Sequence, residues 1–225
     1  MCIRDRNRTL QLGSAFGNTG YFGIPVSLAL LPDHALIYSI GFDLGATLVI
    51  WSLGPILLTD PSKVLISNRY WKNFIKGIFS SPAVKGLIGA LIIHSSLWDE
   101  QITDLLWIPS RVVIVLALVI VGMRLSWLTK ANLSRIKNQI TSIKNALIMK
   151  LVGLPVIMLI ISSAIRLPSV MREALVLQAA APTAISILLI SQAASRDEKE
   201  ATSLVVFSTI TALISIPAWL LILRL

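Results

Sequence analysis

The chain has 225 residues, of which 55% are hydrophobic and only 14% are charged. A soluble domain carries about 25% charged residues, so this composition excludes an ordinary water-facing surface and indicates a helical membrane protein with several spans. The net charge of +9 does not indicate nucleic-acid binding, because the basic residues lie between hydrophobic blocks and not in a soluble basic domain.

Seven hydrophobic spans follow one another, most of them about as long as a helix needs to cross a bilayer. We expect them at 10–31, 35–58, 83–97, 105–125, 146–165, 173–194 and 201–223. Residues 1–9 are expected to be a cytoplasmic or non-native lead, and residues 59–82 a basic cytoplasmic linker. Within this linker, apolar residues at helical spacing over 71–80 indicate either an extension of the third span or a helix lying flat in the interface.

The distribution of basic residues predicts the orientation of the chain. If the chain starts inside, sixteen of the 20 Lys and Arg residues fall in cytoplasmic segments. The four that remain outside are Arg111, Arg166, Arg172 and Arg224. Because basic residues accumulate on the cytoplasmic side, this bias predicts a C-terminus outside, and we expect a bacterial inner membrane as the location.

The first and sixth spans differ chemically from the others, because each carries proline with small or polar residues near its middle. The first contains Gly17 to Pro25 (GNTGYFGIP), and the sixth contains Gln178 to Ser186 (QAAAPTAIS). Proline removes a backbone hydrogen bond and glycine weakens helix continuity, so both spans are expected to break. Their opposite directions favour an inverted-repeat transporter with its site at the midplane. The alternative is an ordinary proline kink, which we expect at Pro155 and Pro217.

The block Asn18 to Pro25 resembles the fourth-span motif of the auxin efflux carrier family, which includes plant PIN carriers and bacterial malate or malonate permease-like proteins. The block Ala180 to Ala184 is similar to the ninth-span motif of the same family. The resemblance covers almost the whole chain after about residue 9. It implies a ten-span fold of two inverted five-span repeats, in which the broken fourth and ninth spans cross near the substrate.

The same resemblance implies a domain organisation. Residues 10–58 would be the last two spans of the first repeat and residues 83–225 the second five-span repeat. Three N-terminal spans of the family would then be absent, and we expect the chain to be a fragment. The resemblance also allows a homodimer formed through the second span.

The expected binding site lies at the two breaks. With Lys85, Lys150 and Arg111 expected to snorkel to the membrane surfaces, no cation remains near mid-membrane. Anion binding would therefore depend on the amides of half-helices that restart near Pro25 and Pro182. The expected substrate-binding residues are Asn18, Thr19, Gly20, Gly23, Pro25, Pro182, Thr183 and Ser186. Ser186 stands where bacterial relatives often carry asparagine.

Asp43 is the only acidic residue well inside a span. Carboxylates in lipid usually mark a proton or ion path, so Asp43 is a candidate for proton coupling. The alternative is a structural carboxylate bonded to nearby hydroxyl or backbone groups. His34 and His94 have no partners at metal-ligand spacing and are expected to be solvated or interfacial, and no cofactor is expected.

These features predict an all-α transmembrane protein that transports a small organic anion by alternating access, with the lipid bilayer as its surroundings and no nucleic-acid partner. A sodium-coupled carrier of similar fold, such as the bile acid symporters, is the first alternative, and it would need a cluster of oxygen ligands near the breaks. An intramembrane enzyme is the second, and it would need at least two polar catalytic residues at one depth. We expect no enzyme activity.

Overall fold

The protein is all-α in the computed structural model, which describes residues 8–58, 75, 79, 82–137, 140–193 and 197–224. No strand is found in these ranges. The helices, in chain order, are α1 (Arg8–Ala15), η2 (Thr19–Gly23), α2 (Ile24–Leu30), η3 (Asp33–Ala35), α3 (Leu36–Leu58), α5 (Pro82–His94), α6 (Asp99–Lys137), α7 (Ile140–Ile148), η5 (Met149–Gly153), α8 (Leu154–Ala164), α9 (Ser169–Ala180), α10 (Ile185–Ala193) and α11 (Glu198–Arg224).

Each predicted span coincides with one helix or with consecutive helices along the chain. The fit is loosest for the fourth span, because α6 extends well beyond 105–125 at both ends. Three helical stretches among the described residues are long and apolar enough to cross a membrane, at 33–50, 140–164 and 198–224. A lipid environment favours this all-helical architecture, because a helix satisfies its backbone polar groups internally.

The first and sixth spans are both broken, as their composition predicts. The first stops at Ala15 and resumes at Thr19. The sixth stops at Ala180 and resumes at Ile185, with Pro182 in the gap. Each broken span therefore consists of two half-helices joined by a short non-helical segment.

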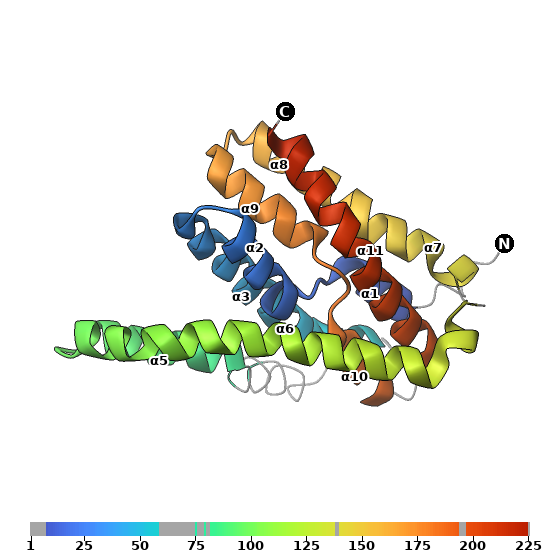
Figure 1. The fold of residues 1–225 in the computed structure, drawn as a ribbon, viewed down its shortest axis with the longest axis horizontal. Helices are drawn as coiled ribbons and strands as arrows, with labels where there is room; N and C mark the ends of the chain where they lie inside the picture. Colours follow the sequence, from blue (N-terminus) through green and yellow to red (C-terminus); the bar gives the residue numbers. More distant parts are fainter. Residues whose placement is uncertain are drawn as a thin grey trace.

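Helix α9 is the centre of the packing. It lies against α3 and α8 and also contacts α11, and Figure 1 shows it between its neighbours on the side of the molecule opposite α6. Its last two turns are almost completely buried, from Ala174 to Ala180 apart from a partly exposed Leu175. This position holds the break at Pro182 inside the protein, where lipid cannot reach its backbone groups.

The fifth span runs continuously through α7, η5 and α8 and widens into a π-helical turn just before Pro155. Proline at 155 has no N–H, so the carbonyl four residues earlier, that of Leu151, loses its helical donor. The indole Nε1 of Trp219 on α11 donates to this carbonyl at 2.9 Å. The expected proline irregularity is therefore real, and a side chain from the last helix satisfies the group it frees.

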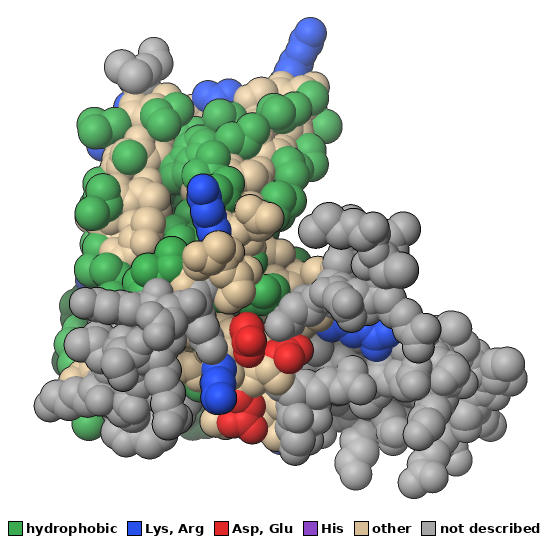
Figure 2. All heavy atoms as spheres, turned by 90° about the vertical axis from the view of Figure 1, so that its right-hand side faces the viewer, with side chains coloured by type: hydrophobic (Ala, Val, Ile, Leu, Met, Phe, Trp, Pro, Cys, Tyr) green, Lys and Arg blue, Asp and Glu red, His purple; other side chains and the backbone are tan. Residues whose placement is uncertain are grey.

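The surface of the described part is largely apolar. Large hydrophobic side chains are exposed along α5 and α6, among them Leu91, Ile92, Leu105 and Trp107. On the face seen in Figure 2, hydrophobic side chains cover the upper part and acidic side chains gather near the lower edge. Such a surface suits contact with lipid.

The basic linker expected at 59–82 lies outside the described residues except for Ile75, Phe79 and Pro82, and the side chains of Ile75 and Phe79 are exposed.

Candidate functional site

The two breaks bond directly to each other. The backbone N–H of Asn18 donates to the carbonyl of Pro182 at 2.6 Å, and the N–H of Ala184 donates to the carbonyl of Phe16 at 3.1 Å. Together these bonds form an antiparallel bridge between Gly17 and Thr183. Buried backbone groups must find partners inside the protein, and each break supplies partners for the other. We call the bonded segments 16–18 and 181–184 the crossing.

Thr183 fastens the crossing to two further helices. Its hydroxyl donates to the carbonyl of Gly13 on α1 at 2.9 Å, and its backbone N–H donates to the hydroxyl of Ser208 on α11 at 3.0 Å. The side chain is fully buried. Thr183 is thus at the predicted place, with its hydroxyl already engaged by the protein.

The helix of the first span does not restart near Pro25 after the break, so the expectation of a restart there is wrong. Helix resumes at Thr19, and the N–H groups of Phe22 and Gly23 both donate to the carbonyl of Asn18, at 3.1 and 3.0 Å. Pro25 lies in the first turn of α2, directly after a wide turn of five residues. Pro25 does not break the helix, because proline is tolerated in the first turn of a helix and the wide turn before it already accommodates its missing N–H.

The second half-helix of each broken span therefore begins at the crossing. It begins at Thr19 in the first span and at Ile185 in the sixth. The first N–H groups of a helix have no partner inside it, and they carry a partial positive charge of about half a unit. Ser186 lies in the first turn of the second half-helix and is partly exposed. Pro182 is buried, and its carbonyl is the acceptor for Asn18.

Asn18 lies at the start of the first half-helix with its side chain free. The residue is 6% exposed, its side chain does not cap the helix, and no hydrogen bond to its side-chain amide is found among the described residues. A buried amide carries two donors and one acceptor that ordinarily require partners. Asn18 thus places an amide at the crossing that no described residue engages.

Asp43 of α3 lies against the same half-helix. The hydroxyl of Thr19 donates to Oδ1 of Asp43 at 2.5 Å. A Cβ at Gly20 would lie 3.1 Å from that oxygen, so Gly20 leaves the space that the carboxylate fills. The structure thus places Asp43, the candidate for proton coupling, against Thr19 and Gly20, two of the expected substrate-binding residues.

Gly23 leaves space for Gln178 of α9 in the same way. A Cβ at Gly23 would overlap the Oε1 atom of Gln178 and lie 2.9 Å from its Cδ. The Gln178 amide is completely buried; Nε2 donates to the hydroxyl of Ser27 at 3.4 Å, and Oε1 has no partner. The two broken spans therefore also contact each other where Gly23 lies against the amide of Gln178.

The position of Lys150 differs most from what the sequence predicts. It was expected to snorkel to the cytoplasmic surface, yet it is 1% exposed and lies beside the crossing. Its Nζ atom donates to the carbonyl of Ala179 at 2.9 Å. A Cβ at Gly17 would lie 3.0 Å from the same Nζ. The expectation that no cation lies within the membrane near the breaks is therefore wrong.

A signal for Lys150 was present in the sequence. The residue sits in an apolar run that leads to Gly153 and Pro155, where the helix widens into the η5 turn. Wide turns of this kind occur often at functional sites. Hydropathy locates a lysine along a helix axis, but it does not say whether the side chain faces lipid or the protein interior.

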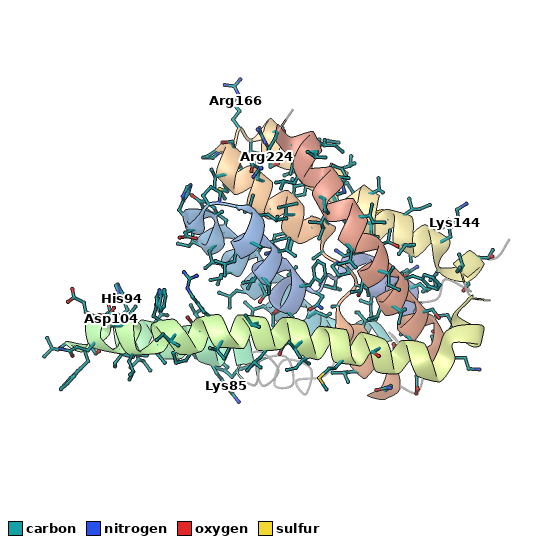
Figure 3. The ribbon with its side chains drawn as sticks, viewed as in Figure 1. Lys85, His94, Asp104, Lys144, Arg166 and Arg224 are labelled. Carbon is teal, nitrogen blue, oxygen red and sulfur yellow. The ribbon has the colours of Figure 1, made fainter. Side chains whose placement is uncertain are left out.

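The other charged candidates lie away from the crossing. Figure 3 shows Lys85, His94, Asp104, Lys144, Arg166 and Arg224 at the periphery of the molecule. His94 pairs with Asp99 at 2.9 Å, and both are exposed. Arg111 stacks over the exposed ring of Trp107, with 4.7 Å between the guanidinium carbon and the ring centre. Within the described ranges, no group of three His, Cys, Asp or Glu residues could hold a metal ion.

Comparison with known proteins identifies a family. The model of a family described as membrane transport protein matches residues 4–220. No curated protein and no solved structure matches the chain.

Proposed function

Because the chain belongs to the membrane transport protein family, to which the auxin efflux carriers are similar, we propose that it is a secondary carrier for a small organic anion that works by alternating access. The family itself establishes that the protein is a membrane transporter.

The observation that carries the proposal is the mutual bonding of the two breaks at Gly17 and Thr183. This contact brings two half-helix N-termini into one region of the protein. Their unpaired N–H groups and positive partial charges favour a carboxylate. A site built from paired broken spans is also what an inverted-repeat carrier places at its midplane.

Asn18 would hold the carboxylate directly. Its amide can donate two hydrogen bonds, and the protein uses neither of them among the described residues. Lys150 adds positive charge behind the crossing without being available itself, because its Nζ is engaged by the carbonyl of Ala179. Ser186 could add a hydroxyl donor from the second half-helix.

Alternating access would require the broken spans to move relative to α3. The contact of Thr19 with Asp43 lies on that boundary. Protonation of Asp43 would weaken a charge-assisted hydrogen bond at the start of the first half-helix, which is how we propose that proton and anion movements are linked.

The proposed location is a bacterial inner membrane with the C-terminus outside. The support is the bias of basic residues toward one set of loops. Arg166 and Arg224 lie at one end of the molecule, and Lys144 lies away from them near the other end (Figure 3).

Uptake by the purified full-length carrier in proteoliposomes tests the proposal. Radiolabelled malate, malonate, another dicarboxylate and an indole carboxylic acid would be offered in turn. We expect uptake of at least one of them, and we expect Asn18→Ala to reduce that uptake by more than tenfold without loss of expression. The matched control is Asn145→Ala, an exposed asparagine on α7. Unchanged uptake by Asn18→Ala would refute the proposed site.

A further inference from the structure

Lys150 is the only Lys, Arg, Asp or Glu that is fully buried among the residues whose burial the structure describes. A charge in this position needs a reason, because removing an ion from water costs several kcal/mol unless the protein compensates for it. The compensation must come from the groups around its Nζ atom, and those that the structure shows there belong to the crossing and to the end of α9.

Those groups are backbone carbonyls. Helix α9 ends at Ala180, and the last four carbonyls of a helix have no partner within it. The carbonyl of Gln178 accepts the N–H of Ala181 at 3.2 Å, and that of Ala179 accepts Lys150. The carbonyl oxygen of Ala181 lies 3.3 Å from the point where a Cβ of Gly17 would be, and Nζ lies 3.0 Å from that point. The Nζ atom is therefore bonded to one carbonyl at the end of α9, and Nζ and a second carbonyl oxygen both border the space that the missing side chain of Gly17 leaves open.

The electrostatics of this space also favour a cation. The C-terminal end of a helix carries a negative partial charge of about half a unit. Both α9 and α1 end at the crossing, so two such ends meet there. In a membrane interior, a cluster of carbonyl oxygens at helix ends is the kind of site that binds Na⁺ in other carriers.

We propose that Lys150 is a tethered cation that occupies the place of an alkali ion at the crossing, so that the carrier needs no Na⁺ there. Lys150 is a positioning residue: it holds the end of α9 in place while the anion binds on the N–H side of the breaks. This inference rests on the proposed function, because it assigns the crossing as the transport site, and it decides against the sodium-coupled alternative.

Lys150 lies within the wide turn η5. The turn spans Met149–Gly153, and Lys150 is its second residue. An inserted residue of this kind rotates the preceding helix relative to the following one. Lys150 points inward, whereas Lys144, on α7 before the wide turn, lies at the periphery of the molecule (Figure 3).

The test measures thermal unfolding in lipid nanodiscs without any substrate, so its outcome does not depend on transport. Wild type and Lys150→Ala would be compared in choline, sodium and methylammonium chloride at equal ionic strength. Wild type should unfold at the same temperature in all three salts. Lys150→Ala should unfold about 5 °C lower or more in choline and recover at least half of that loss in sodium or methylammonium. The control Lys144→Ala should match wild type.

Two outcomes would overturn the proposal: a wild type stabilised by Na⁺ over choline, or a Lys150→Ala variant equally stable in all three salts. If Lys150→Ala cannot be isolated, Lys150→Met is measured in its place, because methionine fills much of the space of lysine without carrying a charge. Its unfolding temperature should fall below that of wild type, and an unchanged value would also overturn the proposal. A carrier that shows the salt effects but no uptake would refute the proposed function and leave the tethered cation standing.

Discussion

Replacing Gly23 with alanine should destabilise the protein through a single contact with Gln178. The new Cβ would overlap Oε1 of Gln178 and lie 2.9 Å from Cδ and 3.2 Å from Nε2. The amide cannot simply turn away, because Gln178 is completely buried and its Nε2 is bonded to Ser27. The first broken span would therefore have to move away from α9.

The expected magnitude follows from overpacking of a filled interior. Adding one carbon to such a site costs about 1–3 kcal/mol of the free energy of unfolding. For a protein of this size, each kcal/mol corresponds to about 2–4 °C in unfolding temperature. We therefore expect Gly23→Ala to unfold about 2–12 °C below wild type.

A double-mutant cycle in nanodiscs isolates the contact. Gln178→Ala removes the obstructing amide, so the double variant should lose at least 1 kcal/mol less than the sum of the two single losses. The matched control is Gly41→Ala on α3, where a Cβ would meet nothing within 4 Å; it should be neutral or slightly stabilising. Losses that add to within about 0.5 kcal/mol would refute the reasoning, because they would show that the two residues do not interact.

Three further results are expected. Trp219→Phe should lower the unfolding temperature by several degrees, because the carbonyl of Leu151 would lose its donor and a buried unpaired acceptor costs about 1–3 kcal/mol; an unchanged temperature would argue against this bond. Ser208→Ala should destabilise to a similar extent, because it removes the acceptor of the Thr183 N–H, and a neutral variant would show that the crossing does not depend on α11. Asp43→Asn should make uptake independent of external pH, and an unchanged pH profile would count against proton coupling.

The class of the protein and the positions of its breaks could be predicted from the sequence. Hydrophobic blocks report membrane insertion because transfer from water to lipid depends on composition over about 20 residues. The breaks near Gly17 and Pro182 were predictable because glycine and proline alter backbone geometry locally, whatever surrounds them. The resemblance added that the two broken spans cross, and the bridge between Gly17 and Thr183 is that contact.

Only the tertiary structure decided which groups meet at the crossing. The restart at Thr19 depends on the wide turn that follows it, and the pairing of Thr19 with Asp43 depends on how α3 packs. Lys150 shows the reason most clearly, because a side chain at a given depth can face lipid or protein. The orientation of its helix, set by packing against distant segments, buries beside the crossing a lysine that was expected at the membrane surface.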